Sequence, residues 1–134
     1  MAAYYLDSSA LLKRYIQELG TTWVRQLTDV AAGNILLTVA LAGPKMIAAV
    51  TRRARGGHLR AVDAARATQD MRFDWQMLYT IVDVSHGLVD RAMTIAETHG
   101  LRGYDAVHLA AALAVLGEKR SRGEPPPILV SADE

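Results

Sequence analysis

The chain has 134 residues, a formal net charge of +1 and no cysteine, a length that suits one domain of residues 1–134 rather than two. With 51% hydrophobic and 22% charged residues it is not a disordered chain, and without cysteine it has neither disulfides nor thiolate metal sites. No apolar run reaches the ~18 residues of a membrane span and no secretory signal is apparent, so we expect a protein of the reducing cytoplasm.

Four short runs of β-branched, aromatic and aliphatic residues are predicted as strands. They are Ala3–Leu6, Ile35–Thr38, Ile81–Val84 and Ile128–Val130. Helical periodicity fills the intervals between them. Strands that alternate with helices favour parallel pairing through right-handed crossovers, with helices on both faces of the sheet. The predicted fold is α/β, a three-layer α/β/α arrangement around a central parallel sheet of about four strands.

Six helices are predicted between these strands. In chain order, they span residues 11–16, 23–30, 46–55, 59–75, 86–99 and 104–116. Thr22 and Ser85 are expected as N-terminal caps, and Gly56 and Gly100 as stop signals. The last helix is apolar nearly all round, as expected of a helix buried against a sheet.

Three aspartates are expected at the edge of the sheet where the strands end. Asp7 directly follows the first strand, Asp133 follows the last, and Asp105 lies in the first turn of the sixth helix. Ligands of open parallel sheets bind at this edge, and carboxylates there suit Mg²⁺, which activates water in phosphodiester hydrolysis. The plainer alternatives are a helix cap for Asp7, a helix-dipole partner for Asp105 and a solvated Asp133.

Three segments that contain these aspartates resemble motifs of VapC-like PIN domains. They are YLDSSALLKRY at residues 5–15, LRGYDAVHLAAAL at 101–113 and VSAD at 130–133. They occur in the family's order, and the resemblance covers essentially the whole chain. Family members usually continue into a short final helix where this chain stops, so we expect a truncated C-terminal end.

The resemblance implies a PIN fold and a toxin with endoribonuclease activity that depends on Mg²⁺ or Mn²⁺. It also implies a homodimer that a cognate antitoxin inhibits. It carries over Asp7, Asp105 and Asp133 as catalytic and metal-binding residues. Ser9 would hold Asp7 by a hydrogen bond, unless it is an ordinary serine at a helix start.

One position departs from the family pattern. The family places an acid, usually glutamate, at the start of the helix after the second strand, where this chain has Lys45, and no Asp or Glu occurs between Asp29 and Asp63. Three acids could still hold one ion with reduced activity, or Lys45 could take the cation's place and leave an impaired module that binds antitoxin or RNA. Lys45 could instead contact an RNA phosphate or extend into solvent.

Two other features remain open on sequence alone. Arg52, Arg53 and Arg55 could bind RNA phosphates, although a solvated helix end is the plainer interpretation. His108 lies one helical turn after Asp105 and could orient it, but a structural histidine is expected.

Overall fold

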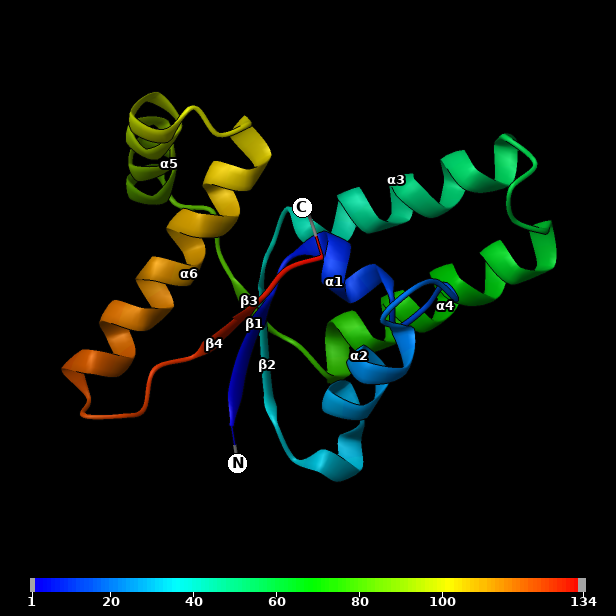
Figure 1. Ribbon diagram of the computed structural model, residues 1–134, viewed down its shortest axis with the longest axis horizontal. Helices are drawn as coiled ribbons and strands as arrows, with labels where there is room; N and C mark the ends of the chain where they lie inside the picture. Colours follow the sequence, from blue (N-terminus) through cyan, green and yellow to red (C-terminus); the bar gives the residue numbers. More distant parts are fainter. Residues whose placement is uncertain (1, 133–134) are drawn as a thin grey trace.

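The computed structural model describes residues 2–132, and its centre is a sheet of four parallel strands. The strands are β1 (Ala3–Leu6), β2 (Ile35–Val39), β3 (Thr80–Val82) and β4 (Ile128–Val130). Their order across the sheet is β3-β2-β1-β4, so β1 lies between β2 and β4 (Figure 1). The predicted strands are confirmed; β2 extends one residue further, and β3 begins one residue earlier and ends at Val82 rather than Val84.

Helices cover both faces of this sheet, which confirms the three-layer prediction (Figure 1). In chain order, the helices and one 3-10 turn are α1 (Ser8–Leu12), α2 (Thr21–Thr28), η1 (Val30–Ala32), α3 (Ala42–Arg55), α4 (Ala61–Met77), α5 (His86–His99) and α6 (Gly103–Ser121). Because side chains alternate along a strand, Leu6 of β1 packs with the α1–α4 side and Tyr5 packs with α5 and α6.

Only the predicted helix at 86–99 keeps both of its ends; α1 ends at Leu12 rather than Ile16, and α3 begins at Ala42 rather than Met46. The first helix begins at Ser8 rather than Leu11, because Asp7 caps it and accepts a hydrogen bond from the backbone of Ala10. Thr22 is not a cap, since Gly20 precedes this helix with a φ of 90°. The sixth helix continues to Ser121, five residues beyond the predicted end at Leu116. The polar residues after Leu116, which the prediction placed in a loop, are helical.

Two other helix signals are confirmed. The hydroxyl of Ser85 accepts a hydrogen bond from the backbone N–H of Leu88 at 3.1 Å, as an N-terminal cap does. Gly100 ends α5 in the left-handed region, with a φ of 65°. No helix in residues 2–132 is both long and apolar enough to cross a membrane.

A network of polar side chains fixes α4 against the first two helices. The carboxylate of Asp74 accepts hydrogen bonds from Nε of Arg14 at 3.1 Å and from the hydroxyl of Tyr15 at 2.7 Å. Tyr15 also contacts the hydroxyl of Tyr79, and Arg14 reaches the hydroxyl of Thr28 at 3.1 Å. Burial raises the pKa of Tyr79 to about 12 and also raises the pKa of Tyr15. The hydroxyls of Tyr79 and Tyr15 are therefore both neutral at physiological pH.

Candidate active site

Asp7 lies at the carboxyl end of β1, as predicted, and is only 8% exposed. Its backbone N–H donates to the carbonyl of Val130 in β4 at 3.1 Å. Its Oδ1 atom accepts two hydrogen bonds, from the hydroxyl of Ser9 at 2.6 Å and from the backbone of Ala10 at 2.9 Å. Asp7 therefore does cap α1. Because both bonds reach Oδ1, the second oxygen is the one left to act on a ligand.

Ser9 connects the two strand ends at this edge of the sheet. The hydrogen bond to Asp7 that the resemblance implied for Ser9 is present. The same hydroxyl accepts a hydrogen bond from the backbone N–H of Ala132 at 3.2 Å. It thus links the segment after β1 to the segment after β4, which leads to Asp133. Asp133 itself lies outside the described residues, so its place in the site remains a prediction.

His108 is a buried structural residue, in line with the expectation for it. The backbone N–H of Ser8 donates to Nε2 at 3.3 Å, which requires that this nitrogen carry no proton. Nδ1 then carries the hydrogen and donates to the hydroxyl of Tyr5 at 2.9 Å. Burial lowers the pKa of His108 to about 4, and the neutral ring joins β1, the start of α1 and α6.

Asp105 lies in the first turn of α6, three residues before His108, and is partly exposed. Asp7 and Asp105 both act on the pKa of His108, which each carboxylate raises against the effect of burial. The same two carboxylates raise the pKa of Tyr104, where burial is again the largest cause. The fold therefore brings Asp7 and Asp105 to the same two side chains, although 98 positions separate them in the sequence.

Lys45 lies in the first turn of α3, and its ammonium is folded over a neighbouring aromatic ring. The Nζ atom is 3.6 Å from the centre of the Tyr104 ring, while Lys45 as a whole stays exposed to solvent. The charge of Lys45 also lowers the pKa of His108. Lys45 therefore lies at the same edge as Asp7 and Asp105.

The side chains at this edge suit a hard divalent cation only in part. Carboxylate oxygens are the ligands that Mg²⁺ and Mn²⁺ prefer, and Asp7 and Asp105 supply them. Within residues 2–132, however, no group of three or more His, Cys, Asp and Glu side chains is placed to hold a metal ion. Lys45 adds a positive charge to the same edge. A cation there would depend on the two described aspartates and would bind against the charge of Lys45.

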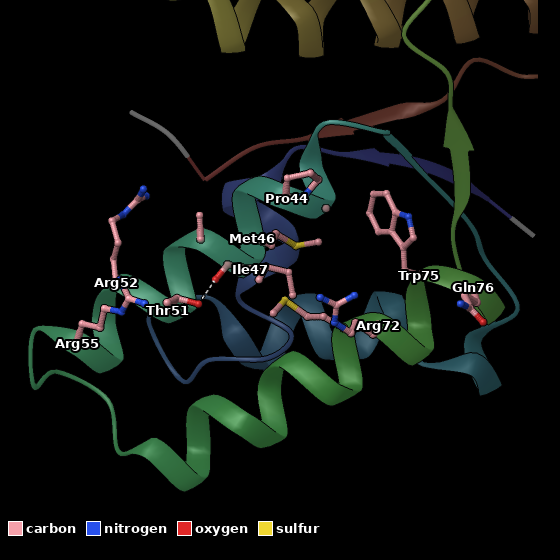
Figure 2. Close-up of a pocket in the computed structure, with 12 residues that line it drawn as sticks. Pro44, Met46, Ile47, Thr51, Arg52, Arg55, Arg72, Trp75 and Gln76 are labelled. Carbon is pink, nitrogen blue, oxygen red and sulfur yellow. Dashed lines mark hydrogen bonds between the residues drawn. The ribbon is translucent and has the colours of Figure 1, made fainter.

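The three arginines at the end of α3 separate into two groups. Arg53 lies 3.5 Å from Glu18 in an ion pair and is partly buried. Arg52 and Arg55 are exposed and line a pocket of about 680 Å³ between α3 and α4. Figure 2 shows these two arginines at one end of the pocket and Trp75 at the other. The basic patch predicted from the sequence is therefore not a single surface.

Sequence reasoning missed two parts of this region. The first is Tyr104, whose ring supports Lys45 and whose proximity to Asp105 in the sequence was its only signal. The second is the wall of the pocket that α4 contributes, including Arg72 and Trp75. The sequence shows helical periodicity in α4 but not which helix its side chains face. Gly43 explains the close approach, because a Cβ there would lie 3.1 Å from the Trp75 ring.

Comparison with curated proteins identifies relatives over most of the chain. Ribonuclease VapC45 of Mycobacterium tuberculosis strain CDC 1551 / Oshkosh is 35% identical over 115 residues, which are 86% of this chain and 78% of that protein. Ribonuclease VapC49 of strain H37Rv matches with the same identity and coverage. No family model matches the sequence.

Solved structures show the same fold at low sequence identity. The sarcin-ricin loop cleaving toxin VapC20 of Mycobacterium tuberculosis is similar with a TM-score of 0.61 and 15% identity, over 90% of this chain and 84% of that one. VapBC2 of Rickettsia felis, bound to a promoter DNA fragment, is similar with a TM-score of 0.59 and 15% identity, over 98% and 99% of the two chains. These matches confirm the resemblance stated from the sequence motifs.

Proposed function

This chain belongs to the VapC ribonuclease family, and we propose that it is a PIN-domain toxin that hydrolyses RNA phosphodiester bonds. The observation that carries the proposal is that Asp7 and Asp105 both lie beside His108: Asp7 precedes Ser8, whose backbone N–H donates to His108, and Asp105 lies one helical turn before His108 in α6. Ligands of parallel sheets bind at this edge, and paired carboxylates are the groups that metal-assisted hydrolysis requires.

Mg²⁺ or Mn²⁺ is the cofactor proposed for this site. Asp7, Asp105 and Asp133 would hold the ion, which would supply a bound water of lowered pKa and a charge to offset that of the phosphate. Ser9 and the backbone of Ala10 fix one oxygen of Asp7, so the carboxylate meets a ligand in one orientation. The three aspartates are thus the proposed catalytic residues.

The activity is proposed to be weaker than that of a site with a full set of acids, because of Lys45. A lysine in place of the expected glutamate removes one carboxylate ligand and adds a positive charge beside the ion. Two unit charges ~4 Å apart interact by roughly 1 to 4 kcal/mol at the dielectric constants of a protein surface. An interaction of about 1.4 kcal/mol, which lies inside that range, already corresponds to a tenfold loss of metal affinity.

A second function is favoured by the same residue. If the charge of Lys45 excludes the cation altogether, the chain is an impaired PIN domain that binds antitoxin or RNA without cutting. The solved complex of VapBC2 supports a protein partner for the toxin chain. For either function we propose a cognate antitoxin as partner and a homodimer as the assembly; RNA is the substrate in the first function and only a bound ligand in the second.

Cleavage of a mixed pool of structured and single-stranded RNA with Mg²⁺ or Mn²⁺ tests the proposal. Asp7→Asn should abolish cutting by the protein, which would assign the activity to this site. If the unmodified protein does not cleave RNA but the Lys45→Glu variant does, the result would support the impaired domain instead. If neither protein cuts any RNA in the pool, the proposed nuclease activity is wrong.

A further inference from the structure

The outer side of α3 carries a row of positive charges that begins beside Asp7 and Asp105, which we name the acid pair. Lys45 is in its first turn, and Arg52 and Arg55 are both in its last turn. At 3.6 residues per turn, Lys45 and Arg52 lie on nearly the same line along the helix, with Arg55 less than a quarter turn away from Arg52. These three exposed residues, Lys45, Arg52 and Arg55, form what we name the α3 basic row.

Within residues 2–132, no acidic side chain pairs with the two arginines of this row. The sequence has no Asp or Glu between residues 29 and 63, so α3 carries four cations and no acid. No acidic side chain lines the pocket beside Arg52 and Arg55, and Arg72 adds a further cation from α4. Among the described residues, neither Arg52 nor Arg55 forms an ion pair, whereas Arg53, about 100° around the helix from Arg52, pairs with Glu18.

We propose that the α3 basic row binds the phosphates of single-stranded RNA and leads the strand away from the acid pair. In this arrangement Lys45 leaves the Tyr104 ring to contact a phosphate next to the bond that is cut, and Arg52 and Arg55 bind phosphates further along. The inference rests on the proposed function for the direction of the strand. It makes Lys45 a residue that binds the substrate, rather than one that only weakens metal binding.

The position of the row favours RNA over an acidic protein segment. A polynucleotide whose phosphodiester lies at Asp7 and Asp105 must continue outward across the neighbouring surface, and Lys45 is at the start of that path. Phosphates that are bound by cations release counterions, so binding of this kind depends steeply on salt. An acidic protein segment in the pocket would have no need of a cation at the acid edge.

Salt dependence of RNA binding without cleavage provides the test. The affinity of the whole chain for a fluorescent single-stranded RNA is measured by anisotropy in EDTA over a series of salt concentrations. The slope of log affinity against log salt should become shallower by about 0.7 in each of Lys45→Met, Arg52→Gln and Arg55→Gln, the value for one lost phosphate contact in single strands. Arg53→Gln is the matched control and should keep the full slope.

Three results would overturn the inference. Equal slopes in all four variants and the parent would mean that the row does not contact phosphates. An equal change in Arg53→Gln would mean a general effect of net charge. If the row variants lose affinity for polyglutamate and keep their affinity for RNA, the row binds an acidic protein segment instead. Cleavage is absent from this assay, so failure of the proposed nuclease activity would not alter the slopes. Thermal unfolding of each variant confirms that it is folded.

Discussion

The ammonium nitrogen of Lys45 lies 3.6 Å from the centre of the Tyr104 ring, and Tyr104 immediately precedes Asp105. A cation on an aromatic face is held by about 0.5 to 1 kcal/mol at exposed sites. This contact is weak enough to exchange for a phosphate or a carboxylate. It nevertheless keeps a positive charge beside the acids in the free protein.

Replacement of Lys45 by glutamate should strengthen cation binding. The substitution removes a repulsion and adds a ligand, so Mn²⁺ should bind at least tenfold more tightly by titration calorimetry, at roughly 1 to 4 kcal/mol per charge contact. Lys45→Met, which removes only the repulsion, should fall between the parent and Lys45→Glu. Equal affinities in all three proteins would show that position 45 does not face the cation.

Removal of the Ser9 hydroxyl should loosen the site and the sheet together. Ser9→Ala loses the bond to Asp7 and leaves the backbone N–H of Ala132 without that acceptor. We expect a loss of about 0.5 to 1.5 kcal/mol in the free energy of unfolding, measured by urea denaturation. Ser9→Thr, which keeps the hydroxyl, should recover most of it. A stable Ser9→Ala protein would mean that water replaces both bonds.

Loss of Asp74 should destabilise the fold far more than loss of an exposed partner. Asp74→Ala leaves the guanidinium of Arg14 and the hydroxyl of Tyr15 without their shared acceptor, at a cost of about 2 to 4 kcal/mol. Asp63→Ala is the control, because Asp63 pairs with Arg60 at 2.8 Å on the surface and should leave stability unchanged. Chemical denaturation of both variants compares the two pairs, and similar stabilities would contradict the expectation.

Stability should fall as the pH drops from about 6.5 towards 4. Burial lowers the pKa of His108 from 6.5 in the unfolded chain to about 4 in the fold, so the unfolded state binds a proton first. The contribution of the neutral ring is complete above pH 6.5 and is lost towards pH 4, on the order of 3 kcal/mol in all. Urea denaturation at several pH values measures it. His108→Gln should show a flatter profile, and an identical profile would assign the effect elsewhere.

The strands, and the helices between them, were predictable in chain order because each has a clear hydrophobic pattern in the sequence. Val130 and Leu6 lie in short apolar runs with clear ends, and both are found in the predicted strands. Helix ends that depend on a single cap were less certain. Ser85 caps α5 as predicted, but Thr22 does not cap α2, because the helix already begins at Thr21 after Gly20.

The site was predictable only in part, for a physical reason. Asp7 and Asp105 each follow from a local rule about strand ends and helix starts. The ring under Lys45 and the ion pair of Arg53 with Glu18 join different helices, and no pattern in one helix records them. The sequence therefore predicts one group of three arginines, and only the fold separates Arg53 from Arg52 and Arg55.

The place of β1 in the middle of the sheet has a consequence for synthesis on the ribosome. Asp7 leaves the exit tunnel well before β4, yet its backbone N–H bonds to Val130, and Ser9 bonds to a backbone group 123 positions later. Domains form as the chain emerges, but contacts between such distant segments come late. The proposed site around Asp7 therefore forms only after β4 has been translated, and the ribosome does not meet it before then.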